Sequence, residues 1–463
     1  MRHIAKSLIL LGLLLTRFSH LDIVWVEEGY PAAAAIQLLH GKQLYREIWF
    51  DKPPLFPYFY LLWGGYTGWP MRLAGVGFVF SCCLLMYKMA ADLWGEREGI
   101  AAASFLAFYL TFGIPSAVMA LAPDLLLIAP HILAIWMVSG VWGSLLTCGR
   151  LPIGPFAAGL IVGVGTLVNT KSVFILAACL LWTGRAWPML LLGFVLPNAA
   201  AFAWFGQPYV QQVWAWGAVY SRYGFSAATG LVRTSNWIGF HSAIVLASFG
   251  FFWKQRSWRW LGWVLLAAVA VAAGWRFFPR YYFQLLVPVV LTGARGFVLL
   301  DRKRWVILAL LVIPLARFGP RYVTLGFDLL SHRPHQWSDL QLFDDSQQAA
   351  NLLTDRRATL LVWGYRPDIF ALTRMQAGTR FLDSQPLTGV IADRHLTNSE
   401  VSYPELAAQS RRELVTTHPD YIVDGLGSFN PALAIAKYPD LREWLSNYHE
   451  VGRTHFSIVY RRF

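Results

Sequence analysis

The sequence predicts a polytopic α-helical membrane protein, with about eleven transmembrane helices, followed by a small α/β domain outside the membrane. The first observation is composition: of 463 residues, 56% are hydrophobic and only 14% are charged, whereas a soluble domain carries about 25% charged residues. The second is a series of apolar segments that fills most of residues 1–325. The third is a change near His332 to short strand patterns that alternate with helical ones. We therefore place a transmembrane domain at residues 1–325 and an extracytoplasmic α/β domain at residues 332–463.

The net charge of +13 does not indicate a nucleic-acid partner. The Lys and Arg residues are dispersed between apolar segments, as membrane orientation requires, and they form no basic face. The cysteines Cys82, Cys83, Cys148 and Cys179 all lie within apolar segments, so we expect them to be buried and reduced. The composition therefore predicts that the lipid bilayer is a partner of this protein.

The first apolar run, residues 7–15, follows the basic residues Arg2 and Lys6, as in a signal peptide. No small-x-small cleavage site follows it. The run alone is too short for the roughly 30 Å hydrocarbon core, so we predict an uncleaved membrane helix that continues toward Trp25.

The first extracytoplasmic loop, residues 20–72, holds two polar stretches. In the first, Glu27 and Glu28 precede Pro31 and an apolar helix pattern at residues 32–39; Pro31 suits a first helical turn and Gly41 the residue past the end. The second stretch runs from residue 51 to 55 and contains two prolines. Residues 56–69 are apolar enough to mimic a span, but they contain a Gly-Gly pair and end at a proline. We predict that they lie along the outer interface.

Ten further apolar segments are expected to span. They are residues 73–93, 100–114, 121–141, 153–168, 172–182, 187–205, 237–253, 260–275, 282–300 and 305–318. Every second connection carries Lys or Arg, which is the pattern of cytoplasmic loops. The N-terminus is therefore predicted to be cytoplasmic and the C-terminal domain extracytoplasmic, in a multi-pass protein of the cell (inner) membrane.

The C-terminal domain is predicted from short patterns. Helices are expected at residues 345–353, 405–414 and 441–448, and strands at 358–363, 421–423 and 457–460. The sequence contains no nucleotide-binding Gly-rich loop here, and no internal repeats.

Polar side chains collect on the extracytoplasmic side of this topology. They are Glu27, Glu28, Asp51, Lys52, Asp124, Asn169, Lys171, Arg222, Tyr223, Arg233, Arg276, Arg280, Tyr281 and Tyr282. An ionised carboxylate beside an alcohol can act as its general base. Several cations on the same face can bind a phosphate whose charge grows as it leaves. This convergence predicts a site for transfer from a lipid-linked phosphate to a hydroxyl group.

These residues also carry a family resemblance. The quoted stretches are Trp25-Val26-Glu27-Glu28-Gly29-Tyr30, then Gly41, Tyr45 and Lys52-Pro53-Pro54-Leu55, Arg72-Leu73, Pro123-Asp124, and Arg276-Phe277-Phe278-Pro279-Arg280-Tyr281-Tyr282 with Pro288. They resemble the GT-C glycosyltransferases, in particular the branch of protein-mannosyltransferase-like and aminoarabinose-transferase-like enzymes that use polyprenyl-phosphate sugars. The resemblance spans nearly the whole chain through short motifs.

The resemblance implies a GT-C fold and an inverting transfer of a hexosyl or pentosyl group. It places Glu27 at the catalytic carboxylate, with Glu28 assisting in acceptor or metal binding. Together with the convergence of polar residues on one face, it leads us to predict substrate binding by Lys52, Asp124, Lys171, Arg222, Arg276, Arg280 and Tyr281. The family commonly has Asp-Glu where this chain has Glu27-Glu28, so the acceptor or the activity itself can differ. Some members use a divalent metal; His20, His40 and His131 lack ligand-like spacing, so we assign no metal to these histidines.

Other interpretations stay open on the sequence alone. Acidic residues favour helix starts, which would account for Glu27, Glu28 and Asp124. Lys171 can reach toward headgroups, and arginines beside aromatic residues anchor helix ends. For the whole protein, the alternatives are a transporter or lipid flippase, which would place ionisable residues near the bilayer midplane, and a non-catalytic binder of a lipid carrier.

Overall fold

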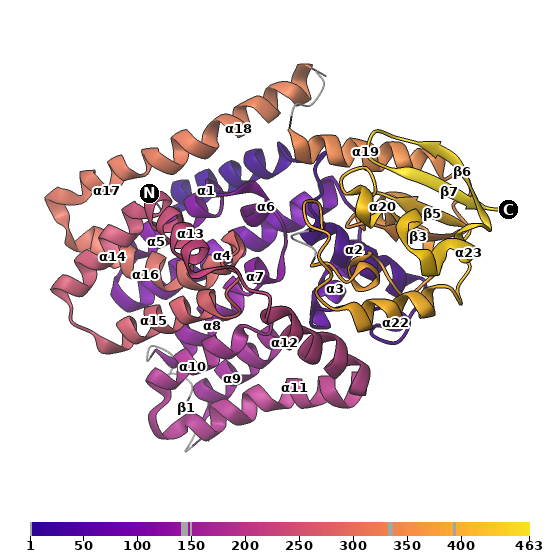
Figure 1. Ribbon diagram of the computed structural model, residues 1–463. Helices are drawn as coiled ribbons and strands as arrows, with labels where there is room; N and C mark the ends of the chain where they lie inside the picture. Colours follow the sequence, from indigo (N-terminus) through magenta and orange to yellow (C-terminus); the bar gives the residue numbers. More distant parts are fainter. Residues whose placement is uncertain (1, 140–146, 149–150, 332–336, 392–394) are drawn as a thin grey trace.

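The computed structural model describes residues 2–139, 147–148, 151–331, 337–391 and 395–463. Long helices form the larger part of the molecule, from α1 (Arg2–Phe18) to α18 (Val312–Ser331), and a sheet with short helices forms the C-terminal part. The C-terminal part lies beyond one end of the long helices (Figure 1).

Every predicted apolar segment coincides with one or two helices. They are α1, α4 (Trp69–Trp94), α5 (Glu96–Tyr109), α7 (Pro123–Leu126) with α8 (Ile128–Val138), α9 (Ile153–Thr166), α10 (Ser172–Thr183), α11 (Trp187–Tyr209), α13 (Ala227–Phe240) with α14 (Ser242–Lys254), α15 (Trp258–Ala272), α16 (Phe283–Leu299), and α17 (Arg304–Leu310) with α18. Among the described residues, four helical stretches are long and apolar enough to cross a membrane, and four more are shorter apolar helices. The number of spans therefore stays a prediction.

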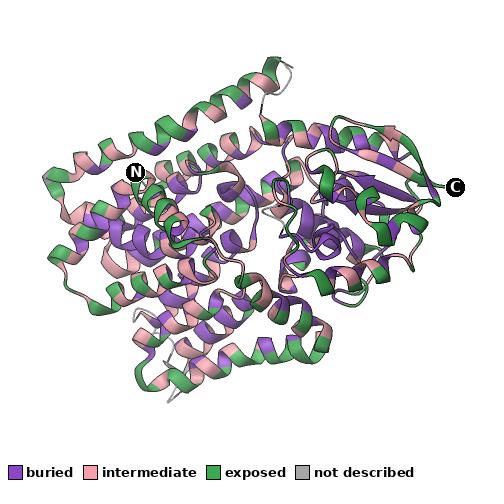
Figure 2. Ribbon diagram, viewed as in Figure 1, coloured by how far each residue is buried: buried purple, intermediate pink, exposed green. Residues whose placement is uncertain are grey.

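Glycines bring the helices of the bundle into close contact. A side chain at Gly296 of α16 would begin 1.8 Å from the carbonyl oxygen of Ala247 in α14, and one at Gly159 of α9 would begin 2.1 Å from the carbonyl oxygen of Leu190 in α11. Backbones can approach in this way only where small residues face each other, as in membrane helix pairs. The buried residues gather inside the bundle, whereas α18 and α11 expose much of their surface (Figure 2).

The first helix ends earlier than predicted. It stops at Phe18 instead of continuing toward Trp25. The reason is Arg72 of α4, whose Nε and Nη2 donate to the carbonyl oxygens of His20 (3.0 Å) and Ile23 (2.5 Å), and these interactions hold the chain in a turn. The helix of the first loop, α2 (Val26–Leu39), begins earlier than predicted, so Pro31 lies inside it and not in its first turn.

The rest of the first loop stays on one side of the bundle. Residues 56–69 contain α3 (Leu55–Tyr60) and the single 3₁₀ turn η1 (Leu61–Trp63), and both are too short to span. Gly41 follows α2 with a φ of +85°, a left-handed conformation that suits glycine after a helix end.

The remaining connections are short elements. They are α6 (Pro115–Val118), β1 (Thr147–Cys148), β2 (Leu151–Pro152), η2 (Gly184–Ala186), the π-helix η3 (Val210–Ala215), α12 (Trp216–Ser221), η4 (Pro279–Tyr282) and η5 (Asp301–Lys303). Gly206, at a φ of +64°, kinks α11 just before η3, so the chain turns back over the bundle end.

The C-terminal part is a mixed five-stranded sheet with the order β4-β3-β5-β7-β6. Its strands are β3 (Thr359–Trp363), β4 (Gln376–Ala377), β5 (Tyr421–Asp424), β6 (Tyr448–Arg453) and β7 (Ile458–Arg462), and β3 runs parallel to both β4 and β5. The helical elements are α19 (Ser338–Leu352), α20 (Asp368–Thr373), α21 (Gln385–Thr388), α22 (Pro404–Leu414), η6 (Pro431–Leu433), η7 (Ile435–Lys437), η8 (Pro439–Leu441) and α23 (Arg442–Leu445). Helix α20 packs on α2 of the first loop.

Two predictions for this part are wrong. The predicted helix at 441–448 is only the short α23, because Tyr448 begins strand β6, which pairs with β7. The helix predicted to begin at Asp345 begins at Ser338. The strands expected at 358–363, 421–423 and 457–460 are β3, β5 and β7, with shifts of one or two residues at some ends.

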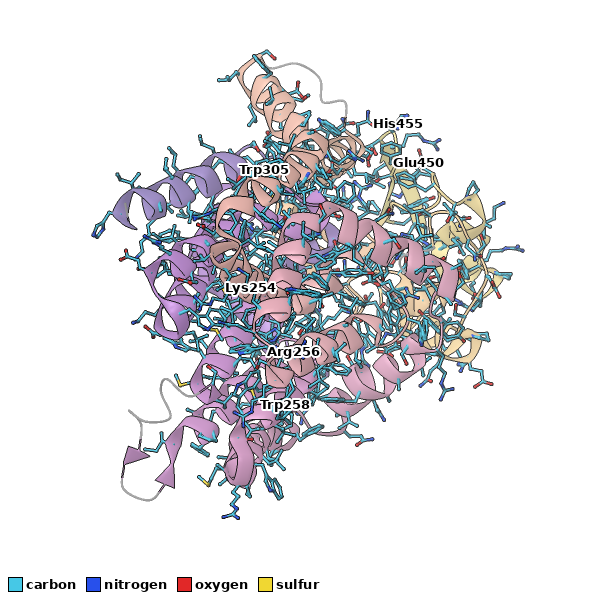
Figure 3. All side chains as sticks on the ribbon, turned by 90° about the vertical axis from the view of Figure 1, so that its left-hand side faces the viewer. Lys254, Arg256, Trp258, Trp305, Glu450 and His455 are labelled. Carbon is cyan, nitrogen blue, oxygen red and sulfur yellow. The ribbon has the colours of Figure 1, made fainter. Side chains whose placement is uncertain are left out.

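Two of the connections that were predicted to be cytoplasmic, those next to Trp258 and Trp305, lie on the face opposite the C-terminal part (Figure 3). Lys254, Arg256, Trp258 and Trp305 lie on this face (Figure 3). The N-terminus is also at this end of the bundle (Figure 1). Basic residues with tryptophans at a helix end are typical of a membrane surface.

Candidate active site

A cavity of about 840 Å³ lies where the bundle meets the C-terminal part. This volume suits a ligand larger than a single sugar. The bundle contributes the start of α2, the loop before α3, the start of α7, the turn before α10, α12 and the segment before α16. The ionisable or polar lining residues are Glu27, Tyr30, Asp51, Lys52, Ser116, Asp124, Asn169, Thr170, Lys171, Tyr220, Ser221, Arg276, Arg280, Tyr281, Asp339, Tyr365, Arg366, Asp368, Gln385 and His395.

Three predicted residues form one ion-pair cluster in this cavity. Arg280 Nη1 donates to Glu27 Oε1, and Arg280 Nε lies 3.6 Å from Asp124 Oδ2. Asn169 Nδ2 donates to the other oxygen, Asp124 Oδ1, at 3.0 Å. Glu27 and Asp124 both lie in the first turn of their helices, where the helix dipole attracts acidic side chains. One guanidinium thus holds two carboxylates that are nearly a hundred residues apart.

Lys171 lies beside this cluster with its ammonium nitrogen shielded from solvent. That nitrogen is 3.1 Å from the ring centroid of Tyr281, and it makes no hydrogen bond to any described residue. Burial lowers the pKa of Lys171 from 10.5 to about 8, Asp124 opposes this shift, and Arg280 adds to it. At pH 7 the amine is still mostly protonated. A buried, charged donor without an acceptor favours an anionic ligand.

Arg276 forms a second wall of the cavity and is almost fully buried. Its Nη1 and Nη2 donate to the carbonyl oxygen of Tyr223 at 2.5 Å and the hydroxyl of Tyr220 at 2.8 Å. The neighbouring residues Trp275 and Phe277 have φ values of +51° and +44°. Left-handed backbone at bulky residues is strained and is found where surrounding structure holds a functional loop in place.

The second polar stretch of the first loop also reaches the cavity. Lys52 Nζ lies 2.7 Å from Asp51 Oδ2, and Tyr45 donates its hydroxyl to the Lys52 carbonyl oxygen at 2.7 Å. Behind them, burial raises the pKa of Asp383 in the C-terminal part to about 7, and the charge of Asp51 adds to this shift. The cavity floor therefore carries both signs of charge.

Two of the predicted catalytic and substrate-binding residues do not lie on the cavity, and neither do Tyr223, Arg233 and Tyr282 of the wider polar set. Glu28 is fully buried and accepts hydrogen bonds from Arg72 Nη1 (2.7 Å) and Nη2 (3.0 Å), and from the backbone N–H of Leu121 at 3.3 Å. These contacts tie α2 to α4 and to the segment before Asp124, so Glu28 supports the site and does not face a substrate. Arg222 is exposed at the end of α12 and is not part of the lining.

The C-terminal wall of the cavity was missed by the sequence analysis. Tyr365, Arg366 and Asp368 follow strand β3, and Gly425 follows the parallel strand β5. Ligands bind outside the carboxyl ends of parallel strands in α/β sheets, so the stretch after the predicted strand 358–363 was a usable signal. Gln385 and His395 complete this wall, and no pattern in the sequence identifies them.

The described residues contain no group of three His, Cys, Asp or Glu side chains placed to hold a metal ion. The two carboxylates that could share a divalent cation, Glu27 and Asp124, already share the guanidinium of Arg280. These two acids therefore do not fit a metal site in this arrangement.

Fold and cavity together define the class: a helical membrane protein with a charged cavity covered by a C-terminal α/β part. Within this class, the chain is similar to ArnT from Cupriavidus metallidurans. The crystal structure of ArnT bound to undecaprenyl phosphate matches 98% of this chain and 97% of its own, with a TM-score of 0.62 and 14% identity. ArnT in the apo state matches the same shares with a TM-score of 0.57 and 14% identity. No protein-family model and no curated protein sequence matches the chain. The predicted fold class, a polytopic helical bundle with a small C-terminal α/β domain, is confirmed, and the chain shares this fold with ArnT.

Proposed function

We propose that this chain is an integral-membrane glycosyltransferase that moves a sugar from a polyprenyl-phosphate donor to a hydroxyl group of an acceptor. The main support is that one cavity combines the carboxylate of Glu27 with the cations Lys171, Arg276 and Arg280. The solved structure of ArnT, which has the same fold, is described as bound to undecaprenyl phosphate. A lipid-linked phosphate is also the anion that can reach this cavity from a bilayer.

In the proposed reaction, the acceptor oxygen attacks the anomeric carbon of the sugar while Glu27 takes its proton. The bond between the anomeric carbon and the phosphate oxygen breaks, and its electron pair leaves with polyprenyl phosphate. Lys171, Arg276 and Arg280 stabilise the charge that develops on this leaving group. A single displacement inverts the anomeric configuration. The carboxylate must be ionised and within hydrogen-bond reach of the acceptor.

The remaining lining residues suggest how the substrates are arranged. Val168, Val173, Phe174, Val213 and Trp214 are apolar lining residues of the cavity, and such side chains suit the start of a polyprenyl chain. The opposite wall, after strands β3 and β5, would hold the acceptor. Covering the cavity in this way also limits water, which would compete as acceptor. The sugar and the acceptor are not specified by these residues.

The proposed orientation puts the C-terminal part outside the cell membrane and the N-terminus in the cytoplasm. The basic connections at Lys254 and Arg256, together with the N-terminus, lie at the end opposite the cavity (Figures 1 and 3). This agrees with an excess of Lys and Arg in cytoplasmic loops. The donor phosphate would then be bound at the outer face.

A transporter or flippase would need its binding residues accessible from both sides in turn. In this chain the cluster lies at one end of the bundle, beneath the C-terminal part, which supports transfer at a fixed site. Cysteine substitution at cavity positions separates the two functions. In a transferase, a membrane-impermeant thiol reagent should modify these positions from the extracytoplasmic side alone.

The proposal is tested with purified protein and a panel of polyprenyl-phosphate sugars. Release of polyprenyl phosphate is expected with at least one donor and acceptor mixture. Glu27→Gln should abolish release and still bind undecaprenyl phosphate. Glu47→Gln is the matched control, because Glu47 is an exposed acid of the same loop that bonds to the Gln43 backbone and lies outside the cavity. Near-normal turnover in Glu27→Gln would refute the assignment of the base. Phosphate binding without turnover in the unmodified protein would instead support a non-catalytic lipid-carrier binder.

A further inference from the structure

Arg280 contacts the proposed base and a second acid of the cavity at once. Its Nη1 donates to Glu27 Oε1, while its Nε faces Asp124. Of the two acids, Glu27 is the more open: 19% of its side chain is exposed, compared with 5% of the Asp124 side chain. The contact with Glu27 is therefore on the open side of the cluster, where a ligand can compete for the guanidinium.

Lys171 indicates where that ligand would lie. Its ammonium nitrogen is buried and makes no hydrogen bond to any residue that the structure describes. It lies 3.1 Å from the ring centroid of Tyr281, the residue that follows Arg280, and both cations line the cavity, so they are neighbours. An anion that meets the hydrogen-bonding need of Lys171 would also lie next to the guanidinium of Arg280.

We propose that Arg280 exchanges partners during the reaction. The donor phosphate takes the hydrogen bond that Arg280 gives to Glu27 in this structure, and the freed Glu27 oxygen then accepts the proton of the acceptor hydroxyl. This inference rests on the proposed function and deepens it, because it makes the availability of the base depend on a bound phosphate. Asp124, held by Asn169 on its other oxygen, keeps the guanidinium in place during the exchange.

The charges favour this exchange. A polyprenyl-phosphate sugar is a phosphodiester with one negative charge, and the leaving polyprenyl phosphate carries close to two at neutral pH. The attraction of Arg280 for the phosphate therefore grows as the glycosidic bond breaks. A two-pronged arginine–phosphate contact is also stronger than a partly exposed contact with one carboxylate oxygen.

A double-mutant cycle on phosphate binding tests the exchange. Binding of undecaprenyl phosphate in detergent is measured for the unmodified protein, Glu27→Gln, Arg280→Met and the double variant. Glu27→Gln keeps the shape of the side chain but removes the competitor, so it should tighten binding by roughly three- to fivefold. Arg280→Met should weaken binding by roughly tenfold or more. In the Arg280→Met background, Glu27→Gln should have no effect.

Controls separate this exchange from simpler effects. Undecaprenol, which has the same chain without the phosphate, should bind equally to all four proteins, and Arg280→Lys should recover part of the lost phosphate affinity. Tightening by Glu27→Gln that persists undiminished without Arg280 would be a plain charge effect and would overturn the exchange, as would no tightening at all. If the unmodified protein does not distinguish undecaprenyl phosphate from undecaprenol, the proposed function fails together with the exchange.

Discussion

Replacing Lys171 by methionine is expected to weaken binding of undecaprenyl phosphate by roughly 10- to 100-fold at pH 7. The magnitude follows from burial of the amine. The lowering of its pKa from 10.5 to about 8 corresponds to a free-energy cost of about 3 kcal/mol for burying Lys171 in its charged form. A phosphate in front of the amine recovers part of this free energy, and the methionine variant loses that gain.

The affinity for undecaprenyl phosphate should depend on pH through the protonation of Lys171. The amine loses its proton as pH rises through about 8, whereas a bound phosphate raises the pKa of Lys171 and keeps the proton. Affinity should therefore fall above pH 8, by up to roughly 30-fold at pH 9.5, while the phosphate itself stays dianionic. Lys171→Met should bind weakly and show a flat profile. Binding is measured by titration with undecaprenyl phosphate between pH 7 and 9.5.

The thermal stability of the ligand-free protein provides an independent check on the burial of the charged Lys171. A lysine whose pKa is lowered by folding destabilises the protein below about pH 8, and this cost disappears as pH rises toward 10.5. Without ligand at pH 7, Lys171→Met should therefore unfold at a higher temperature than the unmodified protein. A variant that is more stable but binds less phosphate identifies Lys171 as a ligand-binding residue. Unchanged affinity in a folded Lys171→Met protein would refute the role of the amine.

Three further predictions concern the start of α2. Glu27→Asp should retain transfer but lower kcat by roughly 10- to 100-fold, because the shorter side chain draws the carboxylate away from the acceptor; single-turnover kinetics with saturating donor measures this, and loss of donor binding instead would contradict it. Glu28→Gln should destabilise the protein by about 3–5 kcal/mol, because Arg72 is left buried with an uncompensated charge; thermal unfolding and yield report it, and a variant as stable as the unmodified protein would disprove the buried pair. Gly29→Ala should loosen the C-terminal part, since its new carbon would lie 2.9 Å from the backbone nitrogen of Asp368; limited proteolysis should cut the C-terminal part faster, and equal protection would count against this contact.

Local sequence patterns were sufficient to predict most of the helices and strands of this protein. Apolar runs require helices wherever the backbone must satisfy its own hydrogen bonds, and alternate basic connections give the expected orientation. The strand patterns at 358–363 and 421–423 were found because buried parallel strands are short and apolar. Lys171 was selected because a charge between two apolar segments is costly unless it faces water or an anion. Glu27, Asp124 and Arg280 were selected because they lie on the same face and carry the family resemblance.

Tertiary structure alone decided how these residues are used. Glu27 and Glu28 are neighbours in sequence with the same side chain, yet one faces the cavity and the other is buried against Arg72, because successive residues of a helix point in directions about 100° apart. The pairing of Arg280 with Glu27 joins positions that no local pattern connects. The wall of the cavity after β3 became visible only when α20 packed on α2, since that contact brings the carboxyl ends of the parallel strands over the bundle. A sequence determines which groups carry charge, whereas packing determines which of those charges meet.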